Sequence, residues 1–167
     1  MINTSIRRAL VLSSLVLGAT TLFSSKAMAD TVNLNGTVAS TLTLVTSPTT
    51  AATALPLSTG TQQIVQVADL AISTNEALGY TLTATSGNLA KAGGTTSIAY
   101  QVTTTADAVT VVAGDFAIAS GTNYTFASTA ANAVGTGSRD LYIRYTPAAL
   151  QDPGAYAGII TVTVADN

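Results

Sequence analysis

The chain has 167 residues, only 8% of them charged, and it contains no cysteine, histidine or tryptophan. It therefore cannot form disulfides, the common transition-metal sites lack their usual ligands, and catalysis of the Ser-His-Asp type is excluded. A freely soluble domain of this size normally carries more charge. A surface of Thr, Ser, Ala, Asn and Gln favours a protein that packs against copies of itself, although any Thr-rich extracellular domain has a similar composition.

Residues 1–29 have the three-part pattern of a secretory signal peptide. The pair Arg7-Arg8 is basic, residues 9–23 are mostly apolar, and Ala27-Met28-Ala29 supplies small residues before the cleavage point. The apolar run is shorter than the roughly 20 residues of a membrane-spanning helix. We therefore predict an exported protein that begins at Asp30, with 138 residues in one domain and a net charge of −5. Nucleic acid is not an expected partner, because its binding needs clustered Lys and Arg.

Alternation of apolar and polar residues predicts β-strands along the mature chain. Strands are predicted at 32–38, 41–44, 64–72, 78–84, 98–102, 141–145 and 156–164, with shorter candidates at 109–112, 116–118 and 124–126. The apolar phase changes within 64–72, which indicates a β-bulge near Ala68-Asp69. Turn residues separate the strands at 47–50, 86–94, 135–137 and 147–154. This spacing of strands and turns predicts a single all-β domain, a β-sandwich.

The segment Asp152-Pro153-Gly154-Ala155-Tyr156 opens the last predicted strand. In immunoglobulin-like sandwiches, a tyrosine at the start of strand F bonds an upstream backbone group through its hydroxyl. A glycine two positions earlier permits the tight corner. We therefore predict a tyrosine corner at Gly154 and Tyr156, and an immunoglobulin-like fold in which the last run is strand F.

If the last run is strand F, the chain ends at Asn167 without a strand G. We then expect an incomplete sandwich with unpaired backbone groups and an open apolar groove. The groove-facing residues of the last strand would be Ile160, Val162 and Val164.

Residues 30–38 are a candidate for the missing strand. Val32, Leu34 and Val38 alternate with polar residues, and Gly36 interrupts the run. Burying these three side chains in the groove of a neighbouring copy would contribute roughly 1.5–3 kcal/mol each, and backbone pairing would set the register. Alternatively, the segment pairs within its own chain and gives a closed monomer.

Both ends of the mature chain resemble one family. The segment 31–38, TVNLNGTV, and the segment 153–164, PGAYAGIITVTV, are similar to those of chaperone–usher pilins, especially the archaic class related to the spore coat protein U family. In that family a periplasmic chaperone first fills the groove of an incomplete immunoglobulin-like sandwich. The N-terminal extension of the next subunit later replaces the chaperone, at an outer-membrane usher.

The resemblance implies a signal peptide at 1–29, a donor-strand extension at 30–38 and a pilin domain at 39–167. It also implies a homopolymer on the cell surface, a fimbria, with no enzymatic activity and no cofactor. Val32, Leu34 and Val38 would be the donor residues, and Gly36 would lie where a bulkier side chain would clash. A coat protein or a related filament subunit remains an alternative.

A rival function is a carbohydrate- or wall-binding module. Its aromatic residues would be Tyr80, Tyr100, Tyr124, Tyr142, Tyr145 and Tyr156. The acids could bind calcium only if the fold gathered Asp69, Asp107, Asp115 and Asp140, and no repeat or EF-hand spacing indicates this. A Ser-Lys nucleophile would have to use Lys91, which we place in a loop without an oriented partner.

Overall fold

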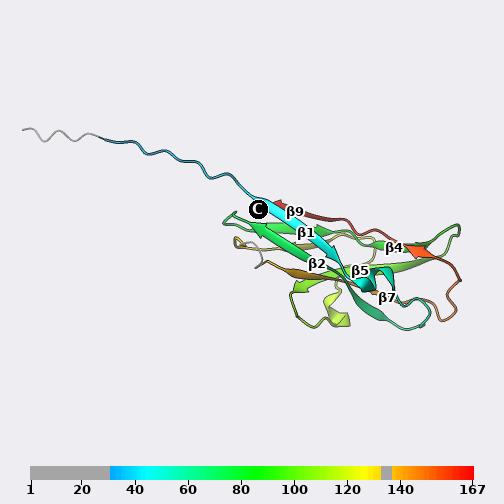
Figure 1. Ribbon diagram of the computed structural model, residues 1–167. Helices are drawn as coiled ribbons and strands as arrows, with labels where there is room; N and C mark the ends of the chain where they lie inside the picture. The colour runs from blue at the N-terminus through cyan, green and yellow to red at the C-terminus, as the bar shows by residue number, and fades with distance from the viewer. Residues whose placement is uncertain (1–30, 133–136) are drawn as a thin grey trace, which may run out of the picture. The chain divides into compact units, whose positions relative to one another are not determined.

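A computed structural model describes residues 31–132 and 137–167 (Figure 1). The predicted signal peptide, the predicted N-terminus at Asp30 and most of the turn at 135–137 lie outside these residues. Residues 38–167 form one compact unit that holds all the described strands, and the described residues 31–37 lie outside this unit. Within the described residues, no helix is long and apolar enough to cross a membrane.

The larger of two sheets in this unit has six antiparallel strands, in the order β1-β2-β7-β5-β4-β8. In that order the strands span Leu42–Pro48, Gln63–Thr74, Arg139–Tyr145, Ser97–Ala106, Gly87–Lys91 and Tyr156–Ala157. The predicted bulge in β2 is confirmed, because the register of its pairing with β7 shifts between Gln66 and Ala68. The extra residue lets both halves of this strand turn their apolar side chains toward the core.

The smaller sheet has three antiparallel strands, in the order β6-β3-β9. These strands span Tyr124–Ala127, Tyr80–Ala84 and Val162–Asp166. Two short 3-10 helices, η1 (Thr50–Thr53) and η2 (Ala113–Asp115), lie in the connections.

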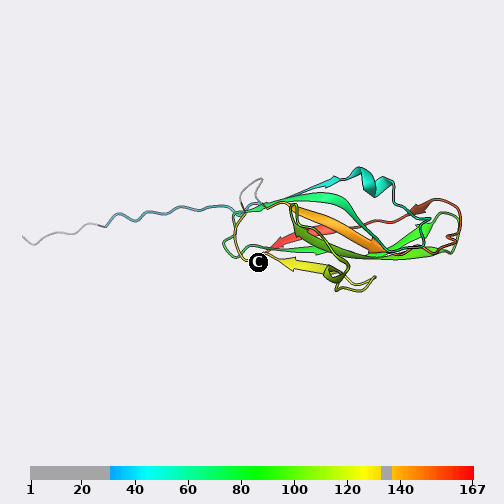
Figure 2. The ribbon, with the colours of Figure 1, turned by 90° about the horizontal axis from the view of Figure 1, so that it is seen from below.

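The hydrophobic core lies between the two sheets (Figure 2). Its largest fully buried side chains are Leu70, Ile72, Tyr80, Leu82 and Val102. They lie at alternate positions along β2, β3 and β5, as expected for strands with one face in a core. The predicted fold class is confirmed: the protein is all-β, and its two antiparallel sheets form an immunoglobulin-like sandwich.

The final apolar run is not a single strand, and this prediction was wrong. Tyr156 and Ala157 form β8, which pairs with β4 at the edge of the larger sheet. β9 pairs with β3 in the smaller sheet, so residues 158–161 cross from one sheet to the other. Apolar alternation continues through the crossing because both sheets face the same core, and a change of sheet therefore leaves no break in the pattern.

Three predictions between residues 86 and 118 were also wrong. Residues 87–91 form the strand β4, paired with β5, rather than part of a turn. Residues 109–112 and 116–118 are not strands. Both lie in the connection between β5 and β6, where Gln101 Nε2 donates to the carbonyl of Ile118 at 2.7 Å and Phe116 is buried. The apolar residues of this connection cover the outer face of the larger sheet. A segment that buries apolar residues in this way has a sequence pattern like that of a strand.

Candidate functional site

β1 and β9 are edge strands of different sheets. Each pairs on one side only, β1 with β2 and β9 with β3, and Figure 1 shows the two strands side by side. The inward-facing side chains of Leu44 and Val164 are only half-buried, whereas Leu70 and Leu82 on the adjoining strands have no exposed surface. The core is therefore incompletely covered along this side of the sandwich.

A cleft of about 270 Å³ opens into the core between these two edge strands. Most of its lining is apolar. It comes from β1, from η1 and Leu55 two residues beyond it, from the approach to β9 and its first residue, and from the inner strands that form its floor. The lining residues are Thr46, Pro48, Ala52, Leu55, Val67, Ala68, Leu89, Tyr100, Leu141, Ile143, Gly158, Ile160 and Val162. Two residues that we predicted for a groove, Ile160 and Val162, line this cleft, and Val164 lies half-buried further along β9.

Asp166, at the end of β9, links the two edge strands through polar contacts. Its carboxylate accepts hydrogen bonds from the Ser40 hydroxyl at 2.7 Å and the Thr74 hydroxyl at 2.8 Å. These contacts tie β9 to the start of β1 and the end of β2. The lining of the cleft includes Pro48 and Ile160 but none of these three polar residues.

The opposite side of the sandwich, between β5 and β6, is bridged by side chains. Thr104 of β5 and Tyr124 of β6 are joined by hydrogen bonds of 3.1 and 3.2 Å. Arg139 donates to Thr104, and its guanidinium lies 3.4 Å from the centre of the Phe126 ring. The two sides of the sandwich therefore differ: the side between β5 and β6 is closed by packed side chains, and the side between β1 and β9 leaves an apolar groove.

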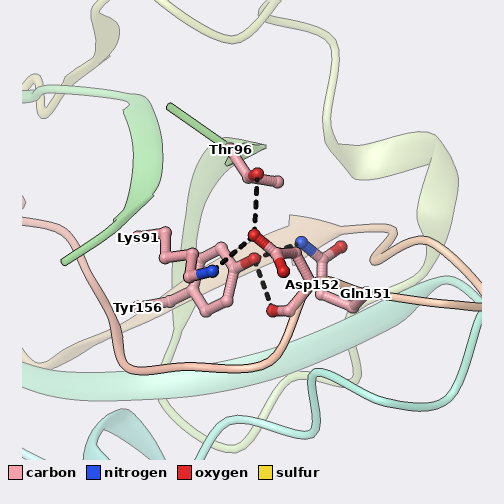
Figure 3. A network of polar contacts seen from close by, with 5 residues as sticks. All are labelled: Lys91, Thr96, Gln151, Asp152 and Tyr156. Carbon is pink, nitrogen blue, oxygen red and sulfur yellow. Dashed lines mark hydrogen bonds and ion pairs between the residues drawn. The ribbon is translucent and has the colours of Figure 1, made fainter. Parts of the chain in front are cut away.

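The chain enters β8 through a polar network at the predicted corner (Figure 3). The Tyr156 hydroxyl donates to the carbonyl oxygen of Asp152 at 2.8 Å and accepts a hydrogen bond from Gln151 Nε2 at 2.7 Å. Lys91, at the end of β4, forms an ion pair with the Asp152 carboxylate, to which Thr96 also donates. The hydrogen bond from Lys91 is the main cause that lowers the pKa of Asp152.

Gly154 lies within this corner in a conformation that favours glycine. Its φ is 145°, and a Cβ atom built there would lie 2.8 Å from the Lys91 side chain. The hydrogen bond expected from Tyr156 and the glycine expected before it are both present. However, the strand that follows is the two-residue β8 of the larger sheet, not the start of an unbroken strand F.

The predicted donor residues lie in a stretch without secondary structure. Residues 31–41 contain no helix and no strand. The exposed fractions of Val32, Leu34 and Val38 are 81%, 90% and 87%. A Cβ atom at Gly36 would meet no other atom within 4 Å.

The tyrosines do not form an exposed aromatic surface. Tyr80, Tyr100 and Tyr145 are buried, and burial raises the pKa of Tyr145 to about 12. The other three are half-buried: Tyr124, Tyr142 and Tyr156. Since sugar rings stack on accessible aromatic faces, the arrangement does not favour the carbohydrate-binding alternative.

Three of the four aspartates considered for calcium line one open surface pocket, namely Asp69, Asp107 and Asp140. Asp115 is part of η2, where its carboxylate accepts from the backbone N–H of Val112 at 2.8 Å. Across residues 31–132 and 137–167, no group of three or more potential ligands is arranged to hold a metal ion.

Sequence comparison with models of known protein families and with curated proteins finds no match. The fold and the groove therefore define the class, an all-β sandwich with one open, apolar side.

Proposed function

We propose that this protein is a structural subunit of a cell-surface pilus or fimbria that polymerises by donor-strand exchange. In this proposal residues 30–38 of one copy fill the groove of another copy. The observation that carries the proposal is the apolar cleft between β1 and β9, which lies between two strand edges and exposes part of the core. An extended peptide can pair its backbone with an unpaired strand edge and place its side chains in the apolar cleft.

The segment 31–38 has the composition that such an occupant needs. A strand added beside β9 would turn every second side chain toward the core. Val32, Leu34 and Val38 share that parity, and they are now almost fully exposed. Their burial would contribute roughly 1.5–3 kcal/mol each. Asn33 and Asn35 would face outward, where polar side chains remain hydrated.

The groove would also need protection before assembly. An uncovered apolar cleft beside two free strand edges invites uncontrolled association. A periplasmic chaperone and an outer-membrane usher are therefore the proposed partners, in keeping with the predicted signal peptide and the resemblance to pilins. The low charge of the surface agrees with a subunit that spends its life packed against copies of itself.

The test joins the groove and its occupant in one chain. Residues 39–167 are extended by a short Gly/Ser-rich linker and a copy of residues 30–38, so that the segment reaches its own groove at high effective concentration. We expect a soluble monomer that unfolds at a clearly higher temperature than residues 39–167 alone.

Two variants of the appended copy separate specific insertion from a general effect. Leu34→Asp should abolish the gain, because a buried, unpaired carboxylate is costly. Asn33→Asp adds the same charge at an outward position and should retain most of the gain. If residues 39–167 alone are equally stable and monomeric, the sandwich needs no donor and the proposed function is wrong.

A further inference from the structure

Asn35 and Gly36 form the single Asn-Gly pair in the sequence. Both residues are exposed and lie in the stretch that has no helix or strand. Within the described residues, no hydrogen bond engages the backbone N–H of Gly36. Around Gly36 there is open space, since a Cβ atom there would have no neighbour within 4 Å.

These are the conditions under which asparagine deamidates without an enzyme. The backbone nitrogen of Gly36 attacks the Asn35 side-chain carbonyl carbon, a new C–N bond closes a five-membered succinimide, and ammonia leaves. Water then opens the ring at either carbonyl and gives aspartate or isoaspartate. The reaction needs a backbone that can bring the nitrogen onto the side chain, and glycine hinders this approach least. Asparagine is accordingly among the thermally labile residues.

We propose that Asn35 is a spontaneous modification site, deamidated while the segment is free and protected once the segment is paired as a strand. The site itself follows from the exposed Asn-Gly pair. The protection rests on the proposed function. In a paired strand the backbone is held extended, so the Gly36 nitrogen cannot reach the side-chain carbon of Asn35.

The two products would affect a donor strand differently. Aspartate at position 35 adds one negative charge on the outward side of the strand. Isoaspartate routes the main chain through the side-chain carbon and lengthens it by one atom between Leu34 and Val38. Because side chains alternate strictly along a strand, this insertion prevents Val38 from keeping its register with Leu34. Isoaspartate formation would therefore remove ageing, unassembled subunits from the pool that can donate, whereas subunits with aspartate at position 35 would remain in it.

The test compares two asparagines in the same segment. Asn33 is equally exposed but is followed by Leu34, whose side chain hinders ring closure. Mature protein is separated by size into monomeric and polymeric fractions, incubated at mildly alkaline pH and mapped by peptide mass spectrometry. In the monomer we expect a gain of about 1 Da at Asn35, as aspartate and isoaspartate, about tenfold or more faster than at Asn33. Gly36→Ala should slow the conversion.

The outcomes separate the two claims. Equal rates at Asn35 and Asn33 in the monomer would overturn the modification site, whatever the segment does in a polymer. Conversion at Asn35 that is as fast in polymer as in monomer would overturn the protection, and with it the assignment of this segment as the donor strand. Should no polymer form, the proposed function fails while the comparison in the monomer still decides the site.

Discussion

The hydroxyl of Tyr156 reaches back four residues and donates a hydrogen bond to the carbonyl oxygen of Asp152 at 2.8 Å. This bond closes the loop that brings the chain from β7 to β8, and Gln151 Nε2 completes it by donating to the same hydroxyl. Immediately after β8 the chain crosses to the other sheet and forms one side of the groove. The corner therefore fixes the start of β8, directly before the residues that line the proposed binding site.

We expect Tyr156→Phe to lower the free energy of unfolding by roughly 0.5–1.5 kcal/mol, the net contribution of a typical hydrogen bond. Denaturant melts of the monomer in which residues 39–167 carry the linker and the appended copy of residues 30–38 would measure the change. Tyr142→Phe is the matched control, because the half-buried Tyr142 hydroxyl has no hydrogen-bond partner within the described residues. Equal effects of the two substitutions would show that the corner bond contributes nothing specific.

Ile159 and Ile160 are adjacent residues that face opposite directions. Ile160 lines the cleft, whereas the Ile159 side chain is 83% exposed. Ile160→Ser removes apolar surface from the groove and should weaken binding of a peptide with the sequence 30–38 about tenfold or more, whereas Ile159→Ser should leave it unchanged. Fluorescence anisotropy of the labelled peptide with residues 39–167 would report both affinities. A loss of affinity in the Ile159 variant, or none in the Ile160 variant, would place the binding site elsewhere.

Burial raises the pKa of the Asp140 carboxyl above its ordinary value of 3.8. The nearby Asp107 and Asp69 raise it further, and the hydrogen bond from the Ala108 backbone N–H opposes the rise. The folded protein then holds this proton more tightly than the unfolded chain does. The contribution of this group to stability therefore falls as the pH rises from about 3.8 through the raised pKa of the folded state.

Asp140→Asn removes the buried charge and keeps an oxygen that can accept from Ala108. We expect it to raise the thermal unfolding midpoint at neutral pH and to change it little in acid, where the wild-type carboxyl is already protonated. Asp115→Asn, which removes an exposed charge from η2, serves as the control. A midpoint for Asp140→Asn that lies below wild type at neutral pH would contradict the expectation.

The export prediction concerns the N-terminus. From the Ala27-Met28-Ala29 pattern we expect the protein isolated from cells to begin at Asp30. Intact mass measurement decides the point, because cleavage one residue earlier or later gives a distinct mass. Retention of Met1 to Ala29 would contradict an exported subunit.

Several features could be predicted from the sequence because they depend on local patterns. Alternation along 64–72 and 141–145 predicted β2 and β7, and the change of phase predicted the bulge. The Gly154 and Tyr156 pair predicted a hydrogen bond that spans only four residues. In each case the signal and the structure it produces lie within the same short segment.

The partners across the sandwich could not be predicted in this way. Asp166 meets Ser40 and Thr74 over sequence separations of 126 and 92 residues, and nothing in the local sequence marks the three as a cluster. Likewise, nothing in the sequence around Arg139 indicates that its guanidinium closes one side of the sandwich against Phe126. Such contacts depend on which strands become neighbours.

The sequence by itself determined that this protein is all-β, which residues of its long alternating strands face the core, and that an apolar, alternating segment precedes the domain. Only the tertiary structure decided that the last apolar run divides between two sheets and that a cleft opens between β1 and β9. The physical reason is that alternation specifies which face of a strand is buried, but not which sheet the strand joins. That choice is made by the packing of residues distant in the chain, and it places Ile160 and Val162 at the groove.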